Sequence, residues 1–474
     1  MDPVVDETLV HLAPFLAPRA SLAERMAAGK ALREKVPRKQ QGIWPAERRT
    51  TDPLAFLISQ NAVRNQALVP VRMGRMLASP FAFLRGSAGI MAGDLASSPR
   101  TDTIVVACGD MHVSNFGLFG TAERNLVFAI NDFDEVYHAT WEWDVKRLAT
   151  SAAVAARHLG GDAAHAREAA EATTRSYVRH IRRYSGMGYL QVWYDRIDEA
   201  TILGLVPANL RKAAAGIFSK ARARGHLRTL ERLTEEIDGS KRLIEQRPIL
   251  IRETHSTDGA PIMETLDQML GSYIASLSEE RRILLSRYRI VDVVRKIVGV
   301  GSVGTSCWVI MLTGQDQSDP LFLQVKEALP SVLASHFKGV GQIENQGHRI
   351  VLGQRMIQGS PDIFLGWGPT KGSSGRNFYV RQLADMKGGI DLIEGNRTGL
   401  DRLIRYCGLC GYALALAHAK SGQAAIITGY AGTSDALPDA IGQFAMAYAA
   451  QNEQDYELLE NAVKTGRVPA VLGQ

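Results

Sequence analysis

Two short segments combine acidic and amide side chains at spacings that suit metal-assisted phosphoryl transfer. Residues 109–115 read G-D-M-H-V-S-N, so Asp110 precedes Asn115 by five positions, and residues 130–135 read I-N-D-F-D-E at the end of a short apolar run. This chemistry needs a carboxylate that orients the attacking hydroxyl and oxygen ligands for Mg²⁺. We therefore predict that Asp110 orients the acceptor and that Asn115 and Asp132 hold the metal.

Other residues of the same segments extend this hypothesis. Asp134 is a second metal-ligand candidate, and His112 is predicted either to contact a phosphate or to fix the shape of the loop. The alternative is structural: Asp110 and Asn115 would shape a turn and Asp132 would cap one, as short polar side chains often do. The strand ending in D-F-D favours the functional interpretation, because a single D-x-x-x-x-N occurs in many sequences.

A glycine-rich turn and a strand lysine occur almost two hundred residues later in the chain. Residues 299–304 read G-V-G-S-V-G and residues 322–328 read F-L-Q-V-K-E-A. The turn also matches the dinucleotide-binding fingerprint, which requires a helix directly after its last glycine. Residues 305–314 instead predict a strand. The nucleotide-covering arrangement of kinases consists of a strand, a glycine-rich loop, a second strand and a third strand that carries a lysine. The predicted nucleotide ligands are Gly299, Gly301, Ser302, Gly304 and Lys326.

Lys326 is predicted to pair with the nucleotide phosphates and to have a carboxylate partner on the next helix. Glu344 is the best-spaced candidate for that partner, and Glu327 and Gln354 are weaker ones. Two structural alternatives stay open: Lys326 as an exposed strand residue and the glycines as simple turn formers.

Further charged residues lie close to the first segment. Arg72, Arg75 and Arg85 precede it and either contact a phosphate or substrate or fix a helix to its lobe. Asp144, in W-E-W-D-V-K-R-L, fits the acid that in kinase-like folds accepts hydrogen bonds from the catalytic loop. We predict that Asp144 has a structural role, with helix capping as the simpler explanation.

The order of these motifs is permuted relative to kinases, in which the glycine-rich loop and the lysine come first. We therefore predict a circularly permuted, kinase-like two-lobe fold of the α+β class. Its helical lobe carries the catalytic loop, and a small antiparallel sheet for the nucleotide follows later in the chain. Permutation requires the helix predicted at 400–419 to bring residue 420 near residue 101, and Lys326 to lie within a few ångströms of the site of Asp132.

The predicted secondary structure divides the chain into four regions. Strands are expected at 101–108 and 125–130 with a turn between them, and helices at 227–237 and 332–358. The regions are an N-terminal helical segment (1–100), a helical lobe with the catalytic and metal loops (101–285), a sheet lobe with the glycine-rich loop (286–395) and C-terminal helices that complete the helical lobe (396–474).

Composition is that of an ordinary globular protein. The 474 residues are 46% hydrophobic and 22% charged, with a net charge of +6, and a chain of this length is expected to form more than one lobe. Its apolar runs are shorter than the ~20 residues that cross a bilayer, so neither a membrane association nor a secretory signal is expected. The basic stretch at 212–232 holds one aromatic residue, which argues against a nucleic-acid partner. The oligomeric state stays open.

The chain holds four cysteines, too few and too scattered for a disulfide framework. Cys407 and Cys410 have the spacing of a redox or zinc pair, but they lie in a predicted helix without a second such pair nearby. We predict that they are packing residues in a reducing compartment, the cytoplasm.

Several pieces of the chain resemble the bacterial family catalogued as domain of unknown function 2252. The resemblance extends over about residues 50 to 460 and implies no assigned activity. The matching pieces are residues 69–86, 109–117, 130–135, 300–305, 353–358, 362–367 and 415–422.

A looser resemblance is to aminoglycoside and choline kinase-like enzymes, whose loop reads H-G-D-x-x-x-x-N and is followed by I-D-[FW]. It implies that Asp110 is the base and that Asn115 and Asp132 are metal ligands. This chain differs in having Cys108 at the histidine position, a longer gap between Asn115 and Asp132, and the permuted order.

These observations predict a phosphotransferase that uses ATP and Mg²⁺ and acts on a hydroxyl acceptor. The first expectation for the acceptor is a small molecule, and the second is a protein hydroxyl. The stretch 358–368 is expected near the adenine. One alternative is nucleotidyl transfer, in which AMP moves from a reversed ATP. Another is a nucleotide-binding pseudokinase or scaffold without turnover. A dinucleotide oxidoreductase built on 293–304 would require a helix at 305–312.

Overall fold

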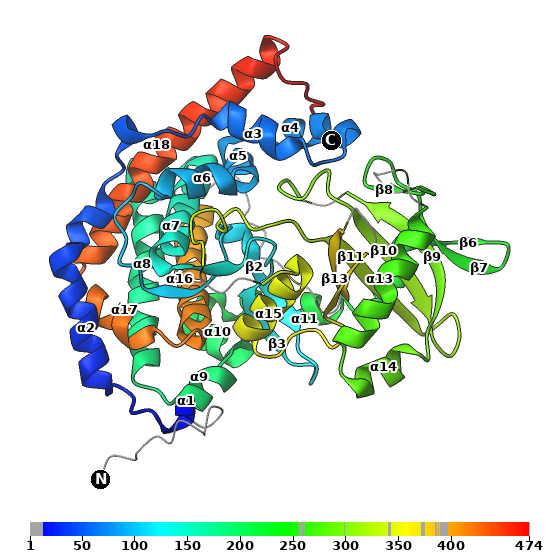
Figure 1. Ribbon diagram of the computed structural model, residues 1–474, viewed down its shortest axis with the longest axis horizontal. Helices are drawn as coiled ribbons and strands as arrows, with labels where there is room; N and C mark the ends of the chain where they lie inside the picture. Colours follow the sequence, from blue (N-terminus) through cyan, green and yellow to red (C-terminus); the bar gives the residue numbers. More distant parts are fainter. Residues whose placement is uncertain are drawn as a thin grey trace.

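The computed structural model describes residues 13–255, 259, 261–297, 299–339, 343–370, 375–383, 386, 388 and 397–473. The protein is of the mixed α+β class, and a large helical part lies beside a smaller part built around an antiparallel sheet (Figure 1). Within the described part of the chain, no helix combines the length and the apolar character needed to span a bilayer.

Long helices from both halves of the chain form the core of the helical part. α7 (Trp141–His158) is buried along nearly its whole length, and its buried residues include the charged side chains of Glu142, Asp144, Lys146 and Arg147. α8 (Ala163–Ser185), α16 (Arg397–Lys420) and α18 (Ala436–Lys464) pack against α7 or against one another. α8 begins at Asp162, whose side chain accepts a hydrogen bond from the backbone N–H of His165.

The residues before the first strand form a helical arm along the outside of the helical part and across the top of the view in Figure 1. α17 (Ala424–Ala431) packs against α2 of this arm. The elements of the arm are α1 (Ala13–Leu16), α2 (Leu22–Lys35), η1 (Arg38–Gly42), η2 (Ala46–Arg48), α3 (Pro53–Asn61), η3 (Gln66–Leu68), α4 (Val69–Met76), α5 (Pro80–Gly86) and α6 (Ala88–Leu95).

Short strands form two nested antiparallel pairs between the arm and α7. β1 (Ile104–Ala107) pairs with β4 (Tyr137–Thr140), and β2 (Phe116–Gly120) pairs with β3 (Leu126–Ile130). The chain therefore passes from the outer pair to the inner pair through residues 108–115 and back through residues 131–136. Because the pairs are nested, both of these loops lie at the same end of the strands.

The larger sheet has the strand order β12–β13–β11–β10–β9–β8, and its neighbours are antiparallel. Its strands are rich in β-branched and aromatic residues, which suit a pleated, buried surface. α15 follows β11 in sequence and begins at the capping side chain of Asn345. The elements are β8 (Leu250–Ile251), β9 (Arg289–Lys296), β10 (Cys307–Thr313), β11 (Pro320–Glu327), α15 (Gln346–Gln358), β12 (Gly366–Pro369) and β13 (Asn377–Gln382).

The elements between α8 and β9 connect the two parts. α13 packs its buried side chains, including Met269 and Tyr273, against one face of the larger sheet. The remaining elements are η4 (Val113–Asn115), α9 (Tyr189–Tyr194), β5 (Ile197–Asp198), α10 (Glu199–Leu205), η5 (Ala208–Leu210), α11 (Arg211–Arg222), α12 (His226–Leu233), β6 (Thr234–Ile237), β7 (Ser240–Leu243), α13 (Ile262–Ser276) and α14 (Glu279–Leu285).

The structure corrects several sequence-based expectations. The predicted turn between the first two strands contains β2, whose glycines concealed its strand character. The helix expected at 332–358 is only α15, and its first half is irregular where described, with residues 340–342 outside the described part. The helix expected at 227–237 ends at Leu233 and continues as β6.

Candidate functional site

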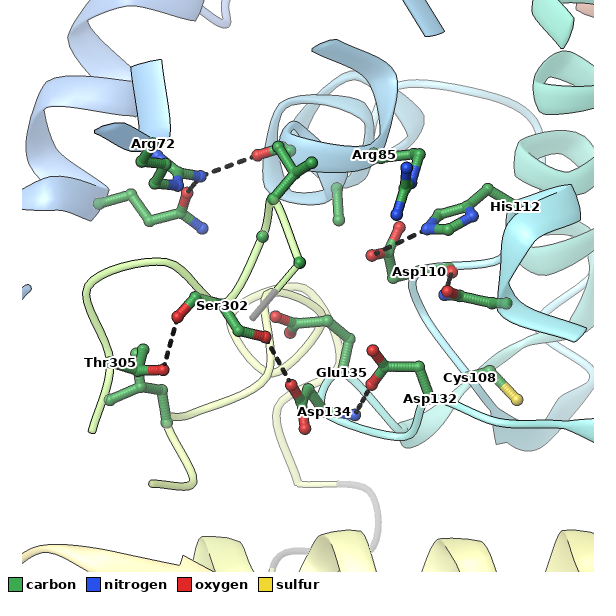
Figure 2. Close-up of a pocket in the computed structure, with 18 of the residues that line it drawn as sticks. Arg72, Arg85, Cys108, Asp110, His112, Asp132, Asp134, Glu135, Ser302 and Thr305 are labelled. Carbon is green, nitrogen blue, oxygen red and sulfur yellow. Dashed lines mark hydrogen bonds and ion pairs between the residues drawn. The ribbon is translucent and has the colours of Figure 1, made fainter. Parts of the chain in front are cut away.

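The loops that join the nested strands carry the acidic residues predicted from sequence, and they share one cavity with the glycine-rich turn. The cavity is lined by Asp110, Asn115 and Asp132 from the loops and by Gly301 and Ser302 from the turn between β9 and β10 (Figure 2). The structure thus brings together residues separated by more than 160 positions, such as Ser302 and Asp134, which are 168 positions apart.

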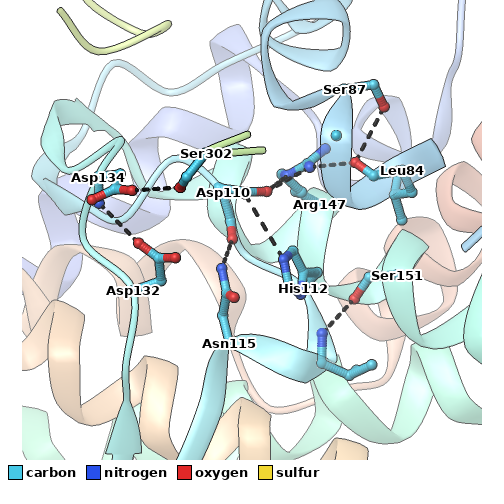
Figure 3. A network of polar contacts seen from close by, with 12 residues as sticks. Leu84, Ser87, Asp110, His112, Asn115, Asp132, Asp134, Arg147, Ser151 and Ser302 are labelled. Carbon is cyan, nitrogen blue, oxygen red and sulfur yellow. Dashed lines mark hydrogen bonds and ion pairs between the residues drawn. The ribbon is translucent and has the colours of Figure 1, made fainter. Parts of the chain in front are cut away.

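Asp110 is held from behind by an arginine of α7. Nε and Nη2 of Arg147 donate to Oδ1 of Asp110 at 3.0 and 2.6 Å, and Nη2 also donates to the carbonyl oxygen of Leu84 (Figure 3). Oδ2 of Asp110 lies 3.8 Å from Nε2 of His112. Burial raises the pKa of Asp110, and the charge and hydrogen bonds of Arg147 oppose that rise. One carboxylate oxygen is therefore fixed and the other is directed toward the cavity.

His112 and Asn115 shape the loop around Asp110. Nδ2 of Asn115 donates to the carbonyl oxygen of Asp110 at 2.6 Å, which leaves the amide oxygen available as a ligand. Burial, with Arg85 and Arg147 nearby, lowers the pKa of His112 well below its ordinary value. Nδ1 of His112 is buried without a hydrogen-bond partner, and both roles predicted for this residue stay predictions.

Asp134 is the point where the two distant segments meet. Nζ of Lys326 on β11 donates to its Oδ2 at 2.6 Å, Ser302 Oγ donates to the same oxygen at 3.1 Å, and the Tyr379 hydroxyl donates to Oδ1 at 2.7 Å. Burial opposes the charge of Asp134, but Lys326 and Tyr379 outweigh it and lower its pKa to about 2. Lys326 thus lies beside the acidic loop.

The partner predicted for Lys326 is wrong. Glu344 is exposed just before α15 and does not reach the lysine, which pairs with Asp134 instead. The reason is that α15 does not begin until Gln346, so Glu344 lies outside the helix that was expected to carry it. A residue of α15 does reach the acidic loop: Arg349 donates to the carbonyl oxygen of Asp134 at 2.9 Å.

Asp132 and Asn115 have the donor set that suits Mg²⁺, which prefers carboxylate and amide oxygens and retains waters. Oδ1 of Asp132 accepts from the backbone N–H of Asp134 at 3.1 Å. Burial and the negative charge of Asp134 raise the pKa of Asp132, although the positive charges of Lys326 and Arg381 oppose that rise. Both oxygens of Asp134 are already engaged, and Asp134 would have to exchange a contact in order to bind metal.

The described residues contain no group of three or more histidine, cysteine, aspartate or glutamate side chains arranged to hold a metal ion. This finding excludes a dense structural site of the zinc type among those residues. It leaves room for the sparse ligation by Asn115 and Asp132 described above.

The glycine-rich turn is held by the helical arm. Nη1 of Arg64 donates to the carbonyl oxygen of Val303 at 2.6 Å. The backbone N–H of Asn65 donates to the carbonyl oxygen of Gly304 at 2.8 Å. Gly304 has a φ of 90°, in the region that favours glycine. Arg75 donates to the carbonyl oxygen of Gly299 at 2.7 Å. The arm therefore fixes the shape of the turn over the cavity.

Asp144 supports the loop that carries Asp110. Its Oδ2 accepts from the backbone N–H of Cys108 at 2.6 Å and its Oδ1 from that of Gly109 at 2.9 Å. Nε2 of His418 on α16 lies 3.2 Å from Oδ2. The supporting role predicted for Asp144 is confirmed, whereas the capping explanation is wrong, because the residue that precedes α7 is Thr140.

The cavity has a volume of about 110 Å³, below the ~300–1,000 Å³ typical of small-molecule sites. Residues 358–368, expected near the adenine, are absent from its described lining. The space therefore suits a phosphate-sized group, and a whole nucleotide would require the glycine-rich turn to move.

Sequence reasoning missed several residues that complete the site. Arg147 follows Asp144 by about one helical turn, so both lie on the same face of α7. This spacing does not reveal that Arg147 contacts Asp110. No sequence pattern indicated Tyr379 or Arg349, because their positions depend on how β13 and α15 pack against the acidic loop. Cys407 and Cys410 are buried free thiols on α16 whose pKa values burial raises, in agreement with a packing role.

The chain belongs to a bacterial family described as "Uncharacterized protein conserved in bacteria (DUF2252)", whose family model matches residues 64–462. The matched range includes the acidic loops, the glycine-rich turn and the arginines of the arm from Arg64 onward. The family resemblance inferred from sequence pieces is thereby confirmed. No curated protein and no solved structure matches the chain.

Proposed function

We propose that this protein is a phosphotransferase with a circularly permuted, kinase-like fold that uses ATP and Mg²⁺. The observation that carries the proposal is the 2.6 Å contact between Nζ of Lys326 and Oδ2 of Asp134, which are 192 positions apart in sequence. This contact joins the strand lysine and the glycine-rich turn to the loop of Asp132, as the permuted order demands.

The strand topology supports the permuted fold. β9, β10 and β11 are neighbours in the sheet, with the glycine-rich turn joining the first pair and Lys326 near the end of the third strand. This is the strand–turn–strand–strand arrangement of kinases. At the other junction, Ser421, just after α16, accepts a hydrogen bond from the backbone N–H of Val106 at 3.1 Å. The helix predicted to precede the catalytic loop in space therefore ends beside β1.

Each proposed role follows from the contacts of the residue. Asp110, with one oxygen fixed by Arg147, would orient the acceptor hydroxyl and receive its proton. Mg²⁺ held by Asn115 and Asp132 would neutralise charge on the phosphates. Lys326 and the backbone N–H groups of the glycine-rich turn would bind the phosphates and stabilise the charge that develops during transfer.

Binding of a nucleotide would rearrange the contacts of Asp134. The hydrogen bond from Ser302 joins the glycine-rich turn to Asp134, and the ion pair with Lys326 joins the same carboxylate to β11. Phosphate oxygens can replace the carboxylate as partners of both groups. The turn would then move away from Asp134 and enlarge the space for the nucleoside.

The proposal is tested by measuring ATP consumption with pools of hydroxyl compounds and identifying the product by mass spectrometry. We expect one pool to stimulate Mg²⁺-dependent formation of ADP and a product heavier by one phosphate. Asp110→Asn should lower the rate by about 10²-fold or more, because it removes the proton acceptor. Asp267→Asn, an exposed position on α13, is the matched control and should leave the rate unchanged.

The alternatives give different products in the same experiment. A product heavier by AMP would establish nucleotidyl transfer instead of phosphoryl transfer. Binding of Mg²⁺ and ATP without turnover in every pool would favour the nucleotide-binding scaffold. Activity that survives unchanged in Asp110→Asn would contradict the role of Asp110.

A further inference from the structure

The wall of the cavity that faces the acidic loops is basic. Arg64, Arg72 and Arg85 line it and belong to the segment that runs from the end of α3 to α5. Figure 2 shows Arg72 and Arg85 on the opposite side of the cavity from Asp132 and Asp134. Because burying a cation is unfavourable unless it is paired, each of these side chains needs a compensating partner.

Arg72 and Arg64 have partners inside the protein. Arg72 donates to the side-chain oxygen of Asn61 at 2.7 Å and to the carbonyl oxygen of Gly86 at 2.8 Å. Arg64 donates to the carbonyl oxygen of Val303 at 2.6 Å. These contacts hold the arm and the glycine-rich turn in place, and they account for both residues without a ligand.

Arg85 has no such partner. Its Nε is buried without a hydrogen-bond partner, as are those of Arg64 and Arg72. Arg85 differs because, among the described residues, its Nη groups form no hydrogen bond or ion pair like those of Arg64 and Arg72. Figure 2 shows the guanidinium pointing toward Asp110 and lying beside His112. Burial lowers the pKa of Arg85, and the negative charges of Asp110 and Asp132 oppose that effect. An oxyanion bound by Arg85 would offset the cost of burying this cation.

The position of Arg85 separates it from the nucleotide-binding groups. Lys326 and Ser302 lie at Asp134, whereas Arg85 lies at Asp110, the residue proposed to orient the acceptor. Arg147 is already committed to Asp110. The side of the cavity next to Asp110 therefore offers one uncommitted cation among the described residues, and a carboxylate that points at the same space.

We infer that the acceptor is a small hydroxy compound that carries an oxyanion, phosphate or carboxylate, and that Arg85 binds this group while Asp110 orients the hydroxyl. The inference rests on the proposed phosphotransferase function and names its substrate class. A cationic acceptor, such as an amino sugar, would instead place its charge against the guanidinium of Arg85. A guanidinium binds carboxylate and phosphate through paired N–H groups, which also fixes the orientation of the ligand.

The transfer step balances with ATP as the only co-reactant. The acceptor hydroxyl oxygen forms a bond to the γ-phosphorus, and the bond from that phosphorus to the β–γ bridging oxygen breaks. ADP keeps the electron pair of the broken bond, and the hydroxyl proton passes to the carboxylate of Asp110. Arg85 holds the oxyanion of the acceptor throughout and forms no covalent bond.

Isothermal titration with inorganic phosphate tests the anion site without any need for turnover. The wild type should bind phosphate, and Arg85→Gln should weaken binding at least about tenfold, the loss expected for a charge-assisted hydrogen bond. Arg85→Lys should retain part of the affinity. Arg48→Gln, an exposed position on η2, is the matched control and should bind like the wild type.

A second comparison separates this site from the nucleotide site. Lys326→Met should weaken the binding of ATP and Mg²⁺, because Lys326 is proposed to contact the nucleotide phosphates, and any loss of phosphate affinity in this variant should be smaller than the loss in Arg85→Gln. Loss of phosphate binding in Lys326→Met but not in Arg85→Gln, or no binding by the wild type, would overturn the inference. Normal phosphate binding together with failure to bind ATP and Mg²⁺ would instead refute the phosphotransferase and leave the Arg85 anion site standing.

The substrate class is tested with glycerol phosphate, glycerate and an amino sugar as acceptors in the ATP-consumption assay. Stimulation by glycerol phosphate or glycerate distinguishes the phosphate from the carboxylate, and Arg85→Gln should raise the KM for that acceptor more than it lowers kcat. Stimulation by the amino sugar alone would contradict the inference.

Discussion

Asp134 shows how one side chain can join segments that are far apart in the chain. Its carboxylate accepts from Lys326 on β11, Tyr379 on β13 and Ser302 in the glycine-rich turn. For Asp132, two residues earlier, burial together with Asp134 raises the pKa, and the charges of Lys326 and Arg381 only oppose that rise. Burial and neighbouring charges thus shift the pKa values of these two carboxylates in opposite directions, down for Asp134 and up for Asp132.

Lys146 allows a pH-dependent prediction that is independent of the site. It is 0% exposed on α7, its Nζ has no hydrogen-bond partner, and it lies 4.7 Å from the ring centre of Phe444. Burial lowers its pKa from 10.5 to about 8, although Glu142 opposes the shift. Between these two pH values the unfolded chain binds more protons than the folded protein, so the contribution of Lys146 to stability rises with pH.

The variant Lys146→Met should therefore be more stable than the wild type at neutral pH, because it removes an unpaired buried cation. The difference in the free energy of unfolding should shrink by about 3 kcal/mol as the pH rises from about 8 to about 10.5. Urea unfolding at a series of pH values measures it, with the exposed Lys212→Met on α11 as the control. A difference that does not change with pH would contradict the assignment of Lys146.

At the scale of elements, the glycine-rich turn depends on the helical arm for its shape. Gly304 has a φ of 90°, and a Cβ atom at this position would lie 3.0 Å from the Cβ of Arg64. Gly304→Ala should lower the free energy of unfolding by about 1–2 kcal/mol, because it forces a side chain into the left-handed region. Urea unfolding measures this loss.

Gly204→Ala is the matched control for this prediction. Gly204 lies in α10, and a Cβ atom added there would meet nothing within 4 Å. Alanine should therefore raise stability by up to about 1 kcal/mol through its higher helix propensity. A Gly304→Ala variant as stable as Gly204→Ala would show that the arm does not constrain the turn.

Periodic and β-branched runs predicted α16, β3 and β10 close to their observed bounds. Shorter features were missed for physical reasons. β2 contains Gly117 and Gly120, which resemble a turn in sequence but pair with β3 in the structure. The residues before α15 lack a helix although their apolar content suggested one, since that stretch packs against the acidic loop through Ser331 and Val332.

The candidate site was predictable where its chemistry resides in local motifs. Asp110, Asn115, Asp132, Lys326 and the glycine-rich turn were identified by spacing. The two acidic loops and the turn line one cavity, whereas Lys326 is buried against Asp134 outside the lining. Contacts between elements were not predictable, because sequence separation does not reveal which carboxylate a lysine reaches. Lys326 therefore pairs with Asp134 rather than with Glu344.

At the scale of the whole molecule, the two halves of the chain depend on each other. α16 and α18 follow the sheet in sequence but pack with α7 and α8, which precede it. Ser421 and His418 then contact β1 and Asp144, close to the loop of Asp110. The loop of Asp110 is thus supported by residues that lie near the end of the chain.

The most direct test of this account is the affinity for ATP in the presence of Mg²⁺, measured by isothermal titration calorimetry on the wild type and two variants. Asp132→Ala alters the early loop and Lys326→Met alters the late strand. Both should weaken binding at least about tenfold, because each removes a charge that would contact the metal or the phosphates. Wild-type affinity in either variant, with the fold intact by circular dichroism, would contradict a single nucleotide site built from both segments.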